Sequence, residues 1–149
     1  MHSFLFSELN KVLGLDYGNV RIGIALSDIT GTFAFGKEFI LNNKDALKYL
    51  KSIIESENVI EIVIGYPVNL KGEISNQAIQ VDEFEVKLKA AVNNESVKII
   101  KWDERFTSKL AAESLIESGM KKKKRREKGN IDIVSAALLL QSYLDSVKK

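Results

Sequence analysis

The most constraining feature of the chain is a change of hydrophobic pattern across one short turn near the start of the sequence. Residues 12–16 form a nearly continuous apolar run that ends in aspartate, and the Tyr-Gly-Asn that follows has the composition of a turn. From residue 20 to residue 27, apolar side chains alternate with small or polar ones, which is typical of a half-buried strand. These two runs predict a β-hairpin, and the apolar and aromatic residues 33–41 predict a third strand beside it.

Beyond residue 43 the helical period and the strand period take turns. Apolar residues at helical spacing, such as Leu47, Leu50 and Ile54, predict helices, and short apolar runs predict strands. The expected helices are 44–57, 75–92, 107–118 and 131–147, and the expected strands are 59–64 and 97–102. Because three strands precede this alternation, the pattern predicts an α/β fold with a mixed five-stranded sheet, an antiparallel first hairpin and helices on both faces.

The length and composition limit what else the chain contains. Its 149 residues, 45% of them hydrophobic, suffice for one buried core, so we expect residues 1–149 to form a single domain. The absence of cysteine excludes disulfides, thiolate zinc sites and a thiol nucleophile. The one histidine, His2, lies beside the initiator methionine and is interpreted as a tail residue. No stretch resembles a membrane span or a signal peptide, so we expect a cytoplasmic protein without membrane contact.

Three acidic residues lie where predicted elements begin or end. Asp16 ends the first apolar run, Glu104 follows the last predicted strand, and Asp132 opens the last predicted helix. Each has a simpler explanation when taken alone. Turn amides would satisfy Asp16, and Arg105 would pair with Glu104. Asp132 would complement the dipole of its helix, behind an Asn130 cap. Because all three stand at element ends that can converge on one edge of the sheet, we interpret them as a carboxylate cluster.

The ligand atoms of this cluster decide which metal it would bind. Carboxylates without histidine or cysteine favour Mg²⁺ or Mn²⁺ over zinc. Two such ions about 3.5–4 Å apart activate a water and stabilise the leaving oxygen in a displacement at phosphorus, so nucleic acid is the expected substrate. Adjacent side chains of a strand point to opposite faces. We therefore expect only one of Asp103 and Glu104 to face the metal, with Glu104 as the ligand and Asp103 in the shell behind it.

A basic run precedes the last predicted helix. Residues 121–128, Lys-Lys-Lys-Lys-Arg-Arg-Glu-Lys, carry a local net charge of +6 in a chain whose total is +2, so the rest of the chain is net acidic. Such a run either attracts a polyanion or is a solvated loop that aids solubility. Because only three residues separate it from Asp132, we favour an interaction with nucleic acid.

Four blocks of sequence follow one another along the chain. The first is Leu-Asp-Tyr-Gly at 15–18 with Arg-Ile-Gly-Ile-Ala at 21–25, and the second is Gly-Tyr-Pro-Val-Asn at 65–69. The third is Trp-Asp-Glu-Arg-Phe-Thr at 102–107, and the fourth is the lysine-rich run with the helix behind it. In this order the blocks resemble the YqgF (RuvX) family of ribonuclease H-like proteins, over nearly all of residues 12–145.

This resemblance implies a ribonuclease H-like fold in which Asp16, Glu104 and Asp132 are the catalytic, metal-binding acids. It also implies a hydrolase of phosphodiester bonds, either a nuclease that processes the 5′ end of pre-16S ribosomal RNA or a Holliday junction resolvase. Two departures from the family pattern, Lys71 in place of an acidic residue and the lack of arginine within 75–81, concern substrate contacts. The residues expected to bind the substrate are Tyr17, Arg21, Asn69, Arg105, Thr107, Lys121, Lys122, Lys123, Lys124, Arg125 and Arg126.

Several of these side chains have structural alternatives. Tyr17 and Trp102 would either stack on an unpaired base or pack in the core, and core packing is favoured for Trp102. Arg105 would bind phosphate or form a surface ion pair. Thr107 would bind phosphate or cap a helix.

Two other functions are compatible with the sequence. The Leu-Gly-Leu-Asp-Tyr-Gly hairpin also resembles the phosphate-binding hairpin of actin-like ATPases and sugar kinases, but those enzymes need two such domains and this chain has room for one. A non-catalytic RNA-binding module of the same fold is the second alternative, and the presence of all three acids argues against it. Either a monomer or a homodimer is expected, and a junction resolvase would act as a two-fold dimer.

The basic run generates the first prediction. Replacing Lys121, Lys122, Lys123 and Lys124 with alanine should weaken nucleic-acid binding and flatten its salt dependence, because each lost phosphate contact on a duplex lowers the slope of log affinity against log salt by about 0.9. Base preference should hardly change, since phosphate contacts carry no sequence information. The measurement is binding of RNA and DNA across a salt series. An unchanged slope would mean that the run is only a solvated loop.

Overall fold

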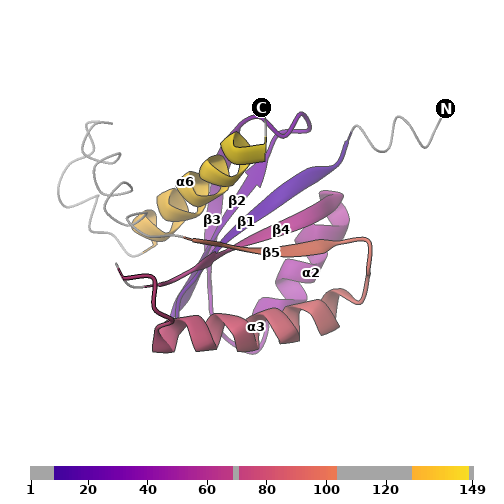
Figure 1. Ribbon diagram of the computed structural model, residues 1–149. Coiled ribbons are helices and arrows are strands. Elements are labelled where there is room, and N and C mark those ends of the chain that lie inside the picture. Colours follow the sequence, from indigo (N-terminus) through magenta and orange to yellow (C-terminus); the bar gives the residue numbers. More distant parts are fainter. Residues whose placement is uncertain (1–8, 69–70, 104–128, 148–149) are drawn as a thin grey trace.

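The computed structural model describes residues 9–68, 71–103 and 129–147, which form five strands and three helices (Figure 1). The predicted helix 107–118 lies outside these residues. In chain order the elements are β1 (Lys11–Tyr17), β2 (Arg21–Ser27), β3 (Ala34–Leu41), α2 (Ala46–Ser56), β4 (Val59–Tyr66), α3 (Asn76–Val92), β5 (Lys98–Asp103) and α6 (Asn130–Val147).

The five strands form one mixed sheet in the order β3-β2-β1-β4-β5. β1 pairs antiparallel with β2, and β2 pairs antiparallel with β3. On the other side, β4 runs parallel to β1, and β5 runs parallel to β4. The predicted mixed sheet with an antiparallel first hairpin is therefore confirmed. We call the edge at which the parallel strands β1, β4 and β5 end the carboxyl edge.

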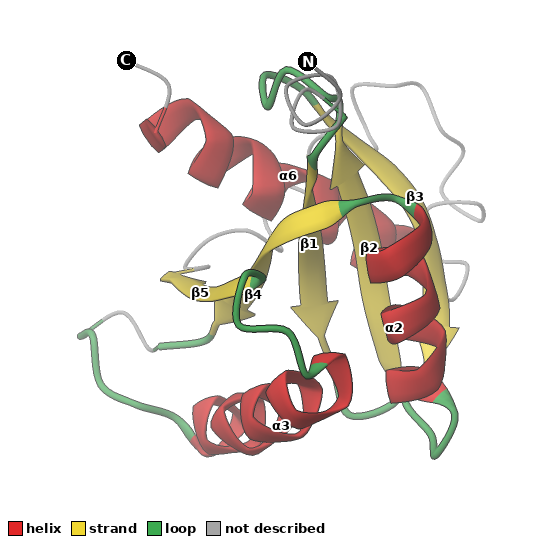
Figure 2. Cartoon of the chain, turned by 90° about the vertical axis from the view of Figure 1, so that its right-hand side faces the viewer, coloured by secondary structure: helices red, strands yellow, loops and turns green. Residues whose placement is uncertain are grey.

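Helices cover both faces of the sheet, as predicted. α2 and α3 lie on one face and α6 lies on the other (Figures 1 and 2). Leu13 and Leu15 of β1 belong to the core under α2 and α3, whereas Val12 belongs to the core under α6. Because β1 is central and covered on both faces, it needs apolar residues at consecutive positions, which explains its continuous apolar run.

Local signals set the ends of the helices and strands close to the predicted ones. The Ser75 hydroxyl caps α3 by accepting a hydrogen bond from the Ala78 amide at 3.2 Å. At its other end, Asn93 takes the left-handed conformation that terminates helices. β4 continues two residues beyond the predicted strand and ends at Tyr66, directly before the only proline, Pro67.

The exposure predicted for β2 is wrong. Ile22 and Ile24 are buried against the α2 and α3 side, but the small residues between them are buried as well. The period of two correctly indicated a strand. It did not indicate that the face with the small side chains is covered by α6, whose Ala136 packs with Ala25 in one core cluster.

Small residues form the floor on which α6 lies. Gly14 of β1 is in register with Ala25 of β2, and Ala25 is in register with Gly36 of β3. A Cβ atom at Gly14 would lie 2.8 Å from the Leu140 Cβ, and one at Gly36 would lie 2.7 Å from the Ile133 Cγ2. α6 therefore packs against the backbone of the sheet.

Gly14→Ala tests this close packing. Alanine normally costs less conformational entropy than glycine in a strand, so a loss of stability would report the clash with α6. We expect a loss of about 1–3 kcal/mol in the free energy of unfolding, as for other overpacked cores. Urea unfolding followed by circular dichroism measures it. An unchanged or higher midpoint would contradict the packing of α6 described above.

Candidate active site

Asp16 lies at the carboxyl edge with its side chain on the face covered by α6. Its strand partner is Gly23 of β2. Residues directly opposite one another in an antiparallel pair point to the same face, and so do alternate residues of a strand. Gly14 and Gly23 both face α6. Asp16 therefore faces α6 too, and it is half-buried.

Asp132 reaches the same place from the other end of the chain. It lies in the first turn of α6, and a Cβ atom at Gly23 would collide with the main-chain carbonyl of Asp132. Asp132 thus rests on the glycine that is the strand partner of Asp16. The fold brings these two predicted acids together on one face at the carboxyl edge.

The position of Asp132 also agrees with the simpler explanation, a first-turn acid at the positive end of the helix dipole. The predicted Asn130 cap needs correction. The helix begins at Asn130, and the preceding Gly129 carbonyl accepts the first helical hydrogen bond from the Ile133 amide at 3.0 Å. Gly129 has a φ of 91°, a conformation that favours glycine.

Arg21 holds the Asp132 side chain in an ion pair. The Arg21 Nε donates to the Asp132 Oδ2 at 2.7 Å, and the two side chains are 30% and 23% exposed. Arg21 lies two residues before Gly23 on β2 and shares its face. The sequence predicts that Arg21 binds substrate but does not predict this contact, because Asp132 is 111 residues away along the chain.

Asp103 lies on the other side of the sheet. Its neighbour Trp102 faces α6, where the indole Nε1 donates to the Ser142 Oγ at 3.2 Å and the ring packs edge-on against Tyr143. Core packing of Trp102, the favoured interpretation, is therefore what the structure has. By alternation Asp103 points to the α3 side, away from the face of Asp16. This is the orientation expected of the acid that does not face the metal, and the role of Asp103 behind the metal ligands stays a prediction.

An ion-pair network lies on the α3 side of the same edge. The Asp82 carboxylate accepts hydrogen bonds from the Lys101 Nζ at 2.8 Å and from the Tyr66 hydroxyl at 3.0 Å. The hydrogen bond from Lys101 lowers the pKa of Asp82, and the same bond raises the pKa of Lys101. Burial and the nearby Asp82 raise the pKa of Tyr66. The network joins β4, β5 and α3 at the carboxyl edge.

Tyr17 points to the face opposite Asp16, because it is the next residue of β1. Its ring packs on Phe84 of α3 with 4.5 Å between the ring centroids.

The remaining predicted site residues lie outside the described part of the chain. They are Glu104, Asn69, Arg105, Thr107, Lys121, Lys122, Lys123, Lys124, Arg125 and Arg126.

The described residues contain no group of three or more acidic, histidine or cysteine side chains that could hold a metal ion. They do contain the pair Asp16 and Asp132, whose donors are all carboxylate oxygens. Oxygen-only donors fit a hard divalent cation such as Mg²⁺ or Mn²⁺. A carboxylate pair needs further ligands from the substrate, water or other residues, as is usual for Mg²⁺ sites.

Comparison with known proteins places the chain in a family. The family described as RuvX, Holliday junction resolvase, matches residues 10–146. A protein of Ruminiclostridium cellulolyticum named "Putative pre-16S rRNA nuclease" is 42% identical, with 92% of this chain and 95% of that protein covered. A protein of the same name from Sulfurihydrogenibium sp. is 43% identical, with 92% and 91% covered.

Two solved resolvase structures share the fold. Fowlpox virus resolvase with its Holliday junction DNA has a TM-score of 0.61 at 15% identity, with 93% of this chain and 99% of that chain covered. Thermus thermophilus RuvC with its Holliday junction substrate has a TM-score of 0.56 at 12% identity, with 91% and 94% covered. At these identities the likeness concerns the fold alone, and it confirms the expected ribonuclease H-like architecture.

The Arg21–Asp132 contact generates a stability prediction. Arg21→Gln and Asp132→Asn should each lower the free energy of unfolding by about 1 kcal/mol without metal, since the pair is partly exposed and screened by solvent. The double variant should lose less than the sum of the two, because both single variants remove the same contact. Urea unfolding in the presence of a chelator measures all three. The Lys11–Glu57 ion pair, 2.7 Å long and formed by no residue of α6, supplies a matched control in Lys11→Gln. Fully additive losses at Arg21 and Asp132 would contradict the ion pair.

Proposed function

Since this chain belongs to the RuvX family, described as Holliday junction resolvases, we propose that it is a metal-dependent endonuclease that hydrolyses phosphodiester bonds in structured nucleic acid. The single observation that carries the proposal is the meeting of Asp16 and Asp132 on one face of the carboxyl edge, where Gly23 makes room for α6. Ligands of open α/β sheets bind at this edge, at the point where the strand order reverses. Here that point lies between β1, which carries Asp16, and β4.

The precursor of 16S ribosomal RNA is the proposed substrate. The two relatives named "Putative pre-16S rRNA nuclease" are 42% and 43% identical to this chain over nearly its whole length. The two resolvase structures that contain a Holliday junction are only 12% and 15% identical. Branched DNA is the competing substrate, because the family is described by junction resolution. A junction resolvase would act as a two-fold dimer, whereas cleavage of one RNA strand needs only a monomer.

The acids proposed to hold the metal are Asp16, Asp132 and Glu104. When bound, Mg²⁺ or Mn²⁺ would lower the pKa of a water and neutralise charge that develops on the phosphate. Asp16 is paired with Gly23 of β2, and the pairing of β1 with β4 ends at the residue before it, Leu15. Asp132 is held by α6 and by Arg21. Such rigid elements keep ligands in place better than loops do. Glu104 directly follows Trp102-Asp103 in the sequence and is proposed as the third ligand.

Arg21 orients one of these acids. Its guanidinium sits on one carboxylate oxygen of Asp132 and leaves the second oxygen for a metal. It also brings a fixed positive charge to the place where a phosphate would bind. Arg21 is therefore proposed to position Asp132 and to attract the substrate, which keeps the substrate role expected from the sequence.

The remaining proposed contacts supply charge for the phosphate backbone. They are the basic residues 121–126 together with Asn69, Arg105 and Thr107.

In the described part of the chain, no helix is long and apolar enough to cross a membrane. The proposed place of action is the cytoplasm, where ribosomal RNA is processed.

Asp16→Asn tests the metal-nuclease proposal. It removes the charge of a proposed ligand while keeping the shape of the side chain, so cleavage should fall by more than about 100-fold with an unchanged circular dichroism spectrum. Mn²⁺ should raise the melting temperature of the wild-type protein and raise that of the variant less. The assay compares a 16S ribosomal RNA precursor with a four-way DNA junction, in Mg²⁺ and in Mn²⁺.

Asp145→Asn is the matched control. It makes the same change of charge near the far end of α6, where the Asp145 carboxylate accepts a hydrogen bond from Gln141. Cleavage by this variant should equal that of the wild-type protein. If Asp16→Asn keeps most of the cleavage activity, the proposed site is wrong. It is also wrong if Mn²⁺ raises the melting temperatures of the wild-type protein and of Asp16→Asn equally.

A further inference from the structure

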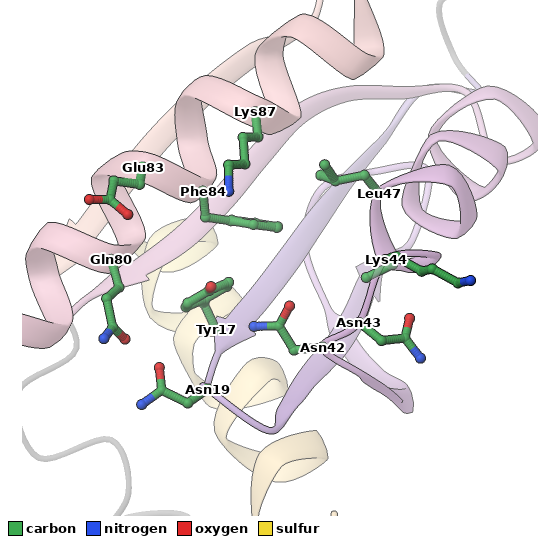
Figure 3. Close-up of a pocket in the computed structure, with 11 residues that line it drawn as sticks. Tyr17, Asn19, Asn42, Asn43, Lys44, Leu47, Gln80, Glu83, Phe84 and Lys87 are labelled. Carbon is green, nitrogen blue, oxygen red and sulfur yellow. The ribbon is translucent and has the colours of Figure 1, made fainter.

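A second site lies at the carboxyl edge, on the face of the sheet opposite Asp16. It is a cavity of about 280 Å³ between the end of β1, the loop before α2, and α3 (Figure 3). Its lining consists of amide, aromatic, apolar and charged side chains. The active site proposed above uses none of the residues that line this cavity, and the sequence predicts a substrate contact for Tyr17 alone among them.

The cavity has an aromatic side. The Tyr17 ring is half-buried and leans on Phe84 at an angle of 37°, and Phe84 itself is only 5% exposed. Both rings line the cavity, and Tyr17 is the more exposed of the two, so Phe84 holds the Tyr17 ring in place as the larger part of the aromatic surface. Leu47 reaches in from α2 and adds an apolar wall (Figure 3). A flat, apolar ligand with polar edges fits such a surface.

Amide groups surround the Tyr17 ring. Asn19, Asn42 and Gln80 come from three different segments and lie around it (Figure 3). Each amide offers both a donor and an acceptor, which is the pattern that pairs with the edges of nucleobases. The Asn42 side-chain amide is fixed by its hydrogen bond to the Gly18 carbonyl at 2.8 Å. The Glu83 carboxylate adds an acceptor of the kind that binds an exocyclic amino group.

The charges of the cavity suit a ligand joined to phosphates. Lys44 lines the cavity from the loop before α2, and Lys87 lines it from α3. Glu83 is the one acid among the lining residues. Lysine binds phosphate as a flexible point charge. The volume lies just below the usual range of about 300–1,000 Å³ for ligand pockets, so it admits one base and not a base pair. A base must leave its stack before it can enter such a pocket.

We propose that this cavity receives one unpaired nucleobase of the strand whose phosphate is held at Asp16. The base stacks on Tyr17, the amides contact its edge, and Lys44 and Lys87 meet the neighbouring phosphates. Because Asp16 and Tyr17 are consecutive residues on opposite faces of β1, the two sites share one strand end. The inference rests on the proposed nuclease function and adds to it that the substrate is single-stranded or splayed beside the scissile bond.

Fluorescence of 2-aminopurine tests the proposal, because stacking on an aromatic ring quenches this base. The full-length protein is titrated, with a chelator present so that no cleavage occurs, into a single-stranded RNA that carries one 2-aminopurine. The same RNA in a perfect duplex is the second arm, and free 2-aminopurine riboside monophosphate is the third. We expect quenching in the single strand, little in the duplex, and at least 10-fold weaker binding of the free nucleotide.

Variants assign the quenching to this cavity. Tyr17→Ala should weaken binding of the single strand by about 10-fold, and Tyr17→Phe should preserve it, since stacking needs only the ring. Gln80→Ala and Lys87→Ala change exposed residues of α3 and should not unfold the protein. Gln80→Ala should alter the preference among RNAs of different base sequence, and Lys87→Ala should weaken binding at low salt. Lys89→Ala, on the same helix but outside the cavity lining, is the control and should bind like the wild-type protein.

The outcomes separate this inference from the nuclease function. Quenching that depends on Tyr17 and Gln80, in a protein that cleaves nothing, would leave the cavity inference standing and reject the nuclease. Cleavage by the wild-type protein, with no quenching and with Tyr17→Ala, Gln80→Ala and Lys87→Ala unchanged in binding, would reject the cavity inference alone. Equal affinity for the free nucleotide and for the strand would also reject it, because the site would then serve a small molecule.

Discussion

The approach of α6 to the sheet depends on residues that have no side chain. A Cβ atom at Gly14, Gly23 or Gly36 would collide with Leu140, Asp132 or Ile133 of the helix. These glycines lie on β1, β2 and β3, so the helix is seated across three strands at once. The acid at the start of α6 is therefore brought to the end of β1 by close packing of backbone, a contact with little freedom to shift. The rest of the candidate active site is arranged around that contact.

β1 organises the chemistry because both of its faces are in use. Asp16 faces α6 and Tyr17 faces α3, so two consecutive residues present a carboxylate and an aromatic ring on opposite sides of the sheet. The strand is central and hydrogen-bonded to neighbours on both sides. Its end is consequently rigid, which suits a site that has to hold a phosphate and an adjoining base in fixed relation. The cavity beside Tyr17 extends the proposed active site along the nucleic-acid strand that the protein is proposed to cleave.

Arg21 links the stability of the fold to the proposed catalysis. Its ion pair with Asp132 joins the first strand pair to the last helix across 111 residues. A partly exposed pair of this kind contributes little to the free energy of unfolding. Its larger effect is geometric, because it fixes one oxygen of a proposed metal ligand. The same guanidinium places positive charge beside the Asp132 carboxylate, which offsets the charge of that acid when no metal is bound.

The amino-acid sequence by itself determined the elements of this fold, because the signals for them are local. The apolar run before Asp16, the alternation in residues 20–27 and the Ser75 cap each act within a few residues, and the structure has the predicted strands and helices there. The acids were recognised by their positions at element ends. Only the tertiary structure decided which faces are covered, and it showed that the small residues of β2 lie under α6 and not in solvent. It also decided that Arg21 pairs with Asp132 and that Asp103 faces away from Asp16. These outcomes depend on the crossing of distant segments, and a period of two or 3.6 residues carries no information about which segment will lie on which face.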